Sequence, residues 1–304
     1  MTSDVQGFAC GNELALGDDE PPGTPFMTQF WRLAAPTRDD YRAVFVNGEV
    51  RCEHELPAVG CRTCARLRHS GRVLPVECPP AWQARPEVTP HPRREHRVTN
   101  AEFTKLRAEL EPDIGPLPPA VGALEPGDRF QPLLLRVPSR PTADFLWPGV
   151  GDLLASDRVR ALWEHEGFTG AVFSRTDFER VGRRSPGAPL RPRGGEPEGA
   201  MRSAAAVADP TGLPRYWHVT VTGTSELPPG VDASSVCAEC GRAVVPAFGS
   251  SRRIVFEPRM WRGTDASILA TTLHVVVTDR VRAALERLSV TNVELLPAED
   301  EVRP

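Results

Sequence analysis

The segment Ser156-Asp157-Arg158-Val159-Arg160-Ala161 has a near copy close to the end of the chain, Thr278-Asp279-Arg280-Val281-Arg282-Ala283. Five of the six positions are identical, and the sixth exchanges serine for threonine. Either hydroxyl residue can cap the first turn of a helix, and the apolar positions that follow recur at helical spacing. Each segment therefore predicts a short amphipathic helix that leads to a strand, at 171–173 and at 293–296.

This similarity has two possible origins. An ancient duplication would give two related halves, each with one helix of this kind and one pair of cysteines. Two amphipathic helices in an arginine-rich chain would also look alike by chance, and no wider repeat is visible. The sequence leaves both origins open.

Most of the remaining patterned segments predict short strands. Strict alternation of apolar and polar residues over 216–222 gives the clearest strand. Thr99 and Glu102 form a capping box, which starts a helix that runs to about Leu110. Proline-rich segments at 79–98 and 111–128 are expected to be loops. Further strands are expected at 30–34, 42–47, 72–76, 130–137, 145–147, 253–256 and 273–277. The pattern predicts an α+β fold of mostly short antiparallel strands with a few short helices.

The chain has 304 residues, including 32 prolines, and a net charge of -4. We expect a single domain over residues 27–304 with a low-complexity insertion at 183–214, which is rich in Arg, Pro and Gly. Residues 1–26 hold five acidic side chains and no basic one. They predict a disordered N-terminal extension, with Met27 as the expected natural start.

The composition argues against several classes of function. No apolar stretch approaches the roughly 18 residues needed to span a membrane. The net charge argues against a strongly basic nucleic-acid binder. A phosphate-binding glycine loop, a dinucleotide fingerprint and a nucleophile elbow are all absent from the sequence, so no residue is nominated as catalytic. Because residues 1–26 lack the apolar stretch of a secretory signal, we expect a cytoplasmic location.

The main chemical feature is two pairs of cysteines, Cys61-Arg62-Thr63-Cys64 and Cys237-Ala238-Glu239-Cys240-Gly241. Two thiolates three positions apart in a tight turn, a zinc knuckle, can hold one metal ion. Two knuckles complete a tetrahedral site of four sulfurs, and cysteines in a reducing compartment favour metal or redox chemistry over disulfides. We therefore predict that Cys61, Cys64, Cys237 and Cys240 meet at one structural Zn2+ site.

Three rival roles for the cysteine pairs stay open. A redox dithiol needs a helix start that lowers a thiol pKa, and no convincing helix follows Cys61. An iron–sulfur cluster would use the same ligand type, and the thiols could also be buried without a metal. His54 is a reserve ligand should a cysteine pair fail. The isolated cysteines and histidines are expected to be ordinary packed or surface side chains: Cys10, Cys52, Cys78, His218 and His274.

The order of these motifs resembles the myxobacterial double-CXXCG motif family, over residues 27–298. The resemblance rests on Leu56–Cys64, Phe103–Leu110, the Leu-Trp-Pro around Trp147, Arg158–Leu162 and Cys237–Gly241. The chain departs from the family at Ala65, where the first motif has glycine, and in the expanded segment 183–214. Members are understood as immunity proteins, which protect a bacterium from a toxin made by its own kin.

The resemblance implies a protein that binds and neutralises a cognate toxin, carries structural zinc and is not an enzyme. Aromatic and arginine side chains dominate the energetics of such interfaces. Trp147, Trp163, Trp217 and Trp261 are therefore candidate anchors, with core packing as the alternative for each. A zinc-stabilised nucleic-acid-binding or regulatory module is the second hypothesis, and a redox enzyme is the third.

Overall fold

The computed structural model describes residues 30–36, 48–63, 67–88, 97–137, 140–149, 152–181, 205–206, 212–226, 237, 256, 258–269 and 274–298. Within these residues the chain is an α+β fold dominated by strands, and most strand pairs are antiparallel, as the sequence predicts.

The described elements, in chain order, are β1 (Phe30–Ala34), β2 (Glu49–Cys52), β3 (Ala58–Gly60), β4 (Leu67–Arg68), β5 (Val73–Glu77), α1 (Pro80–Gln83), the 3-10 turn η2 (Pro86–Val88), β6 (Arg97–Val98), α2 (Asn100–Ile114), β7 (Arg129–Gln131), β8 (Leu133–Val137), β9 (Phe145–Gly149), β10 (Asp152–Ser156), α3 (Asp157–Glu166), β11 (Ala171–Val181), β12 (Ala205–Ala206), β13 (Tyr216–Val221), the 3-10 turn η3 (Pro258–Met260), β14 (Ala266–Ile268), β15 (Val275–Thr278), α5 (Asp279–Arg287) and β16 (Glu294–Pro297).

Four strands and one helix from the middle of the chain form a layer that we call unit A: β9, β10, α3, β11 and β13. The strands lie in the order β9-β10-β13-β11 and are antiparallel, and α3 connects β10 to β11. The strand predicted from the alternation over 216–222 is confirmed as β13, in which Tyr216 belongs to one core cluster and Val219 and Val221 belong to another. Beyond unit A, the second half of β11 pairs with β8, and β8 pairs with β2.

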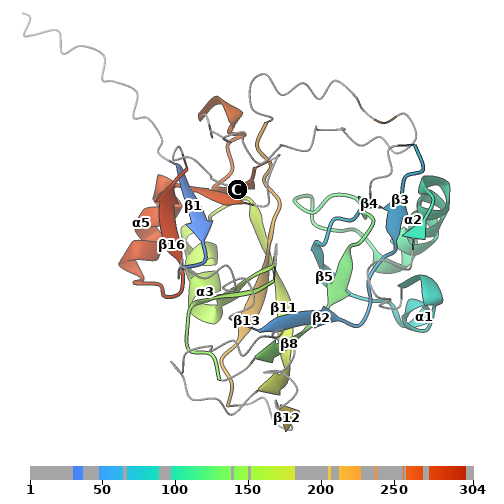
Figure 1. Ribbon diagram of the computed structural model, residues 1–304, viewed down its shortest axis with the longest axis horizontal. Helices are drawn as coiled ribbons and strands as arrows, with labels where there is room; N and C mark the ends of the chain where they lie inside the picture. Colours follow the sequence, from blue (N-terminus) through green and yellow to red (C-terminus); the bar gives the residue numbers. More distant parts are fainter. Residues whose placement is uncertain are drawn as a thin grey trace, which may run out of the picture.

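The end of the chain and its N-terminal strand form a second layer, unit B: β14, β15, α5, β16 and β1. Its strands lie in the order β14-β15-β1-β16 and are also antiparallel. β1 lies between β15 and β16, so the N-terminal strand is central in this sheet. Figure 1 shows the blue strand β1 beside the red elements β16 and α5.

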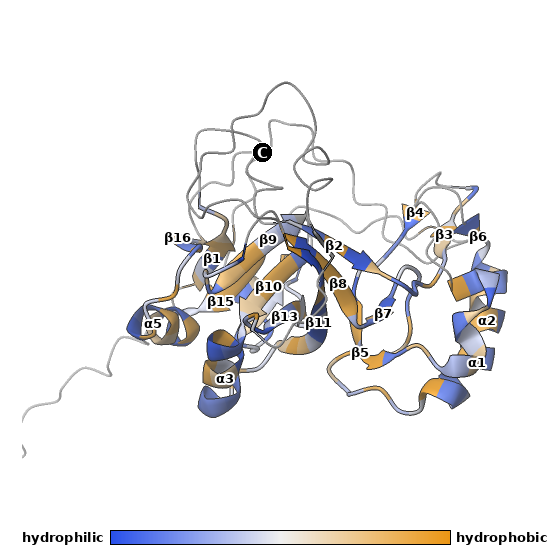
Figure 2. Cartoon of the chain, turned by 90° about the horizontal axis from the view of Figure 1, so that it is seen from below, coloured by the Kyte–Doolittle hydropathy of each residue, from blue (hydrophilic) through white to orange (hydrophobic). Residues whose placement is uncertain are grey.

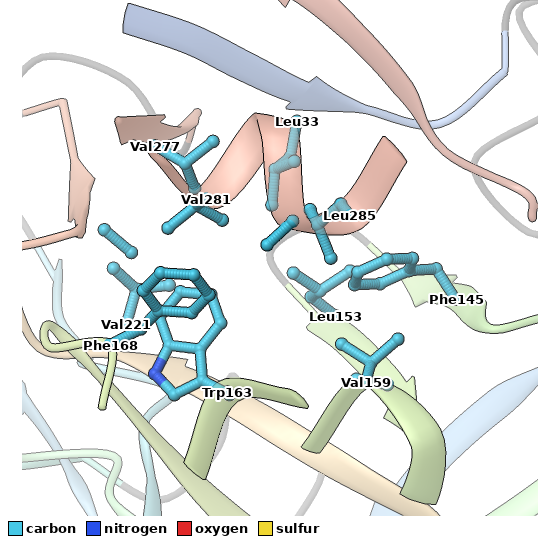
Figure 3. Close-up of a cluster of buried hydrophobic side chains, with 13 residues drawn as sticks. Leu33, Phe145, Leu153, Val159, Trp163, Phe168, Val221, Val277, Val281 and Leu285 are labelled. Atoms are coloured by element: carbon cyan, nitrogen blue, oxygen red, sulfur yellow. The ribbon is translucent and has the colours of Figure 1, made fainter. Parts of the chain in front are cut away.

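Units A and B share one apolar core, which Figure 3 shows in close-up. Both helices send apolar side chains into it, and the buried side chains are at most 8% exposed. Burying a side chain of this size contributes roughly 1.5–3 kcal/mol each, so the core holds the two units together. The labelled members are Leu33, Phe145, Leu153, Val159, Trp163, Phe168, Val221, Val277, Val281 and Leu285.

A second core lies beneath α2, at the other end of the molecule (Figure 1). The predicted capping box is confirmed: Thr99 Oγ1 accepts from the Glu102 amide at 3.2 Å, and the Thr99 amide donates to Glu102 Oε2 at 2.6 Å. The Thr99 amide and the Thr99 hydroxyl both donate to the Glu102 carboxylate, and these two hydrogen bonds lower its pKa. Phe103, Leu106 and Leu110 form the buried face of α2. In Figure 2 this helix carries both hydrophilic and hydrophobic residues, as a half-buried helix should.

Some local predictions were wrong. The segment 79–98, expected to be a loop, contains α1, η2 and β6. Pro80 fits the first turn of α1, where a missing N–H costs nothing. Trp82 is 3% exposed, and its Nε1 donates to Asp113 Oδ2 at 2.6 Å. The strand expected over 130–137 is divided at Pro132 into β7 and β8, and the one at 171–173 continues to Val181 as β11.

Several predictions concern residues outside the described ranges. These are the extension at 1–26, Met27 as the start, the strand at 42–47 and most of the strand at 253–256. Most of the insertion at 183–214 also lies outside them, although Ala205–Ala206 forms β12 and pairs with β11. Among the residues that the structure describes, no helix has the length and apolar character needed to cross a membrane.

Candidate metal centre

Cys61 begins the turn that follows β3. β3 is the middle strand of a small sheet, pairing with β4 on one side and β6 on the other. Leu56 and Val59, just before the turn, are 2% and 1% exposed in the core beneath α2. The next two residues, Arg62 and Thr63, are exposed. The first knuckle is therefore anchored on its strand side and open on its far side.

Cys61 meets the first cysteine of the other knuckle. The Sγ atoms of Cys61 and Cys237 are 3.5 Å apart, although 176 positions separate the two residues. Both residues are buried, at 6% and 7% exposure. A disulfide would place the sulfurs about 2.05 Å apart. Four thiolates around zinc at about 2.3 Å would place them about 3.8 Å apart. The observed separation is thus close to that of two ligands on one metal ion.

The other two predicted ligands, Cys64 and Cys240, lie outside the described residues. The four-sulfur zinc site therefore stays a prediction, of which the structure places the first sulfur of each pair together. Within the described ranges, no group of three or more His, Cys, Asp or Glu side chains could hold a metal ion. Since those ranges contain only two of the four candidate sulfurs, this absence does not bear on the complete site.

The remaining candidates lie elsewhere. Cys52, at the end of β2, contacts Glu55 Oε2 with its Sγ at 3.3 Å. Cys78 is 2% exposed, and burial raises the pKa of its thiol to about 11, so it stays protonated at neutral pH. His54 Nδ1 is buried and has no hydrogen-bond partner within the described part of the chain. Cys10 lies outside the described ranges.

The elements around the second core, β3, β5, α1, α2 and β7, form what we call the lobe beneath α2. A buried charged network joins this lobe to unit A. Arg129 Nη2 lies 2.5 Å from Asp152 Oδ1, and His218 Nε2 lies 3.1 Å from the same oxygen. His218 was expected to be packed on a strand, and it is 3% exposed in β13. Arg and Asp are rarely buried, so neither Arg129 nor Asp152 could be selected from sequence alone.

The network fixes the charges of its members. Burial would raise the pKa of Asp152, but the hydrogen bond from His218 and the charge of Arg129 hold it well below its usual range. Burial lowers the pKa of His218, against the hydrogen bond to Asp152, and the positive charge of Arg129 lowers it further. The three side chains are at most 10% exposed. An enclosed network of this kind joins elements and offers no access to a substrate.

The four tryptophans proposed as anchors all take part in packing. Trp163 is 8% exposed and contacts Phe168 edge to face, with ring centroids 5.2 Å apart. Trp147, Trp217 and Trp261 are half-buried. Trp147 Nε1 donates to the Asn292 carbonyl at 2.8 Å. The ring centroids of Trp261 and Phe30 are 4.5 Å apart. Packing within the fold thus accounts for these contacts.

His274, the second histidine expected on a strand, lies directly before β15 and is half-buried. Burial lowers its pKa, and the positive charge of Arg32 adds to that effect.

No protein-family model matches the chain, and no curated protein compared with it is significantly similar. The resemblance to the double-CXXCG family therefore stays an expectation from the sequence.

Proposed function

We propose that this chain is a zinc-braced immunity protein that acts in the cytoplasm by binding and neutralising a toxin of related bacteria. One observation carries the metal part of the proposal, namely the 3.5 Å separation of the Cys61 and Cys237 sulfurs. Both thiols are buried, and their separation is close to that of two thiolates on one tetrahedral zinc ion. The toxin-binding part rests on the resemblance to the double-CXXCG family.

The proposed zinc would be structural. Cys61, Cys64, Cys237 and Cys240 would fill all four tetrahedral positions, whereas a catalytic zinc keeps one position for water or substrate. When bound, the ion would supply a cross-link between the turn after β3 and the segment that precedes unit B. Cys61 and Cys237 are the buried side of that cross-link.

A braced surface suits inhibition by occlusion. A stable protein–protein interface buries on the order of 1,600 Å2, and it binds more tightly when its surface is already ordered in the free protein. The cross-link would order the segments around both knuckles before the toxin arrives. Inhibition then needs no turnover, which is consistent with a sequence that carries no recognisable catalytic motif.

Co-expression tests this function. Proteins captured with the chain from its native host are expressed in a heterologous bacterium, with and without the full-length chain. We expect one captured protein to be toxic alone, and we expect the chain to restore growth and form a stable complex with it. A captured toxin whose effect the chain does not relieve would refute the immunity function. Capture of nucleic acid with salt-sensitive affinity would favour the regulatory module.

A further inference from the structure

Units A and B have the same topology. In each unit, a short edge strand is followed by a strand that leads directly into a helix. The strand after that helix lies at the opposite side of the unit's sheet from the edge strand. The order β9-β10-β13-β11 in unit A corresponds to β14-β15-β1-β16 in unit B. β13 and β1 take the same place, although β13 follows β11 in the chain and β1 comes from the N-terminus.

The residues within the two units also correspond. Trp217 in β13 lies opposite Ala155, and Trp31 in β1 lies opposite Val277. Each indole Nε1 donates to the aspartate at the start of the adjoining helix, to Asp157 at 2.8 Å and to Asp279 at 3.1 Å. A guanidinium of the same helix stacks over each indole, Arg160 at 3.8 Å and Arg282 at 4.6 Å.

The backbone after each helix follows the same path. Gly167 and Ser289, directly after the last turns, have φ of 64° and 52°. Three residues later, Gly170 and Asn292 have φ of 86° and 62°. Positive φ is uncommon for residues other than glycine. Two such positions at the same spacing are not explained by a chance similarity of two amphipathic helices.

A carboxylate of unit A joins it to unit B. Asp144 accepts from the Ser156 hydroxyl of its own unit at 2.9 Å and from the Thr291 amide of unit B at 3.1 Å. Arg158, at the start of α3, contacts Asp144 at 3.3 Å and donates to the Leu288 carbonyl at 3.0 Å. Leu288 is the C-cap of α5. The start of one helix thus closes the end of the other.

The same contacts occur in the opposite direction. Asp265 of unit B accepts from the Thr278 hydroxyl of its own unit at 3.4 Å and from the Thr169 amide at 2.8 Å. Arg280, at the start of α5, contacts Asp265 at 3.5 Å and donates to the carbonyl of Glu166, the last residue of α3. We call these two sets of contacts the A clamp and the B clamp.

We propose that units A and B are two copies of one unit that pack as an intramolecular dimer, held by the two reciprocal clamps. β1 supplies to unit B the central strand that β13 supplies to unit A. Because each clamp satisfies the last carbonyls of the other unit's helix, neither unit is complete alone, and both unfold together. The intramolecular dimer does not depend on the proposed metal or toxin.

The first test moves β1 to the place that β13 has in unit A. In the structure, the Ala298 amide donates to the Phe30 carbonyl at 2.9 Å, so the end of β16 adjoins the start of β1. A circular permutant that joins Pro304 to Met1 and opens the chain between Pro36 and Gly48 keeps every residue. We expect it to fold with a Tm within about 5 °C of the parent chain. An unfolded permutant would contradict the assignment of β1 to unit B.

The second test compares the clamps in the native chain order. The Asp144 and Asp265 side chains are 5% and 13% exposed. We expect Asp144→Ala and Asp265→Ala to lower Tm by similar amounts, roughly 5–10 °C, since each leaves buried donors unpaired. Asp177→Ala, which removes an exposed carboxylate of β11 paired with Arg175, should have little effect.

Hydrogen exchange then separates a clamp from a local contact. In the Asp144→Ala variant, amide protection should fall equally in α3 of unit A and α5 of unit B, because the two units unfold together. The Asp265→Ala variant should give the same result. A loss confined to the unit that carries the substitution, or a large loss for one aspartate and none for the other, would overturn the proposal.

Discussion

Arg129 and Asp152 form an ion pair of 2.5 Å in which the side chains are 3% and 10% exposed. Arg129 belongs to β7 in the lobe beneath α2, and Asp152 begins β10 of unit A. The guanidinium also donates to the Gly71 carbonyl at 2.6 Å. The pair therefore joins the lobe beneath α2 to unit A by charge.

Removing one partner of the Arg129–Asp152 pair should lower the free energy of unfolding more than replacing both partners with apolar side chains. Asp152→Ala leaves a buried guanidinium without its carboxylate, and we expect a loss of about 3–5 kcal/mol in the free energy of unfolding. The double variant Arg129→Met/Asp152→Leu replaces the pair with apolar groups and should be more stable than Asp152→Ala alone. Urea unfolding monitored by tryptophan fluorescence measures both. A double variant less stable than Asp152→Ala would show that the unpaired guanidinium is not the source of the loss.

The buried histidines predict a dependence of stability on pH. The pKa of His218 is lowered by burial, so the folded chain keeps this ring neutral where the unfolded chain, with a pKa near 6.5, takes up a proton. Protons then favour the unfolded state. The contribution of the neutral histidine to the free energy of unfolding is fully present above about pH 6.5. It is lost as the pH drops below that value, by up to about 1.4 kcal/mol per pH unit for each such group.

Variants identify the source of that slope. Burial also lowers the pKa of His274, so both histidines contribute in the same direction. His218→Gln should reduce the slope of unfolding free energy against pH between about 6.5 and 5, and the double variant with His274→Gln should reduce it further. Urea titrations across that range measure the slope. An unchanged slope in His218→Gln would show that this ring takes up protons equally in the folded and unfolded chains over that range, which would contradict a lowered pKa in the folded chain.

The sequence predictions were correct where local structure depends on residues close in sequence, and they were wrong where it depends on tertiary packing. The capping box of Thr99 and Glu102 and the alternation over 216–222 depend on neighbours in sequence, and both were predicted correctly. α1 was missed because Pro80 and Pro86 indicate a loop, whereas burial of Trp82 decides the local structure. Tertiary packing overrides weak local preferences in such short segments.

Long-range pairing was beyond the sequence. The repeated hexapeptide pointed to two related helices, but nothing in Phe30–Ala34 shows that this strand completes the sheet of unit B. The convergence of Cys61 and Cys237 was expected from chemistry alone, because four sulfurs are needed for a closed zinc site. Asp144 and Asp265, which hold the two units together, carry no local signal, since their partners in the opposite unit, Thr291 and Thr169, lie far away along the chain.

If the chain binds zinc as proposed, serine substitutions at the ligand cysteines should lower zinc content and Tm, whereas substitution of another cysteine should not. We expect about one zinc per chain, and loss of that zinc in Cys61→Ser and in Cys237→Ser. Because zinc affinity in small zinc peptides is on the order of 10 kcal/mol of folding free energy, Tm should fall strongly in both variants. Cys52→Ser is the matched control and should keep the metal, since its sulfur contacts Glu55 instead. Elemental analysis and calorimetry measure the two effects. Full zinc content and an unchanged Tm in Cys237→Ser would refute the site.

The two glycines after α3 should differ in their tolerance of a side chain. Both have positive φ, 64° at Gly167 and 86° at Gly170, so alanine is strained at either position. A Cβ at Gly167 would meet nothing within 4 Å, whereas one at Gly170 would lie 2.1 Å from the Ala266 carbonyl oxygen of unit B. The expected loss of unfolding free energy is about 1–2 kcal/mol for Gly167→Ala, from the backbone alone.

Gly170→Ala adds a steric clash between the new Cβ and the Ala266 carbonyl oxygen of unit B, whose backbone is hydrogen-bonded to unit A. The Ala266 amide donates to the Thr169 carbonyl at 3.1 Å, so relief of the clash would separate the hydrogen-bonded edges of units A and B. We expect a loss at least about 2 kcal/mol larger than that of Gly167→Ala, together with faster exchange of the amides in β14. Equal losses in the two variants would mean that the units do not approach this closely at Gly170 in solution.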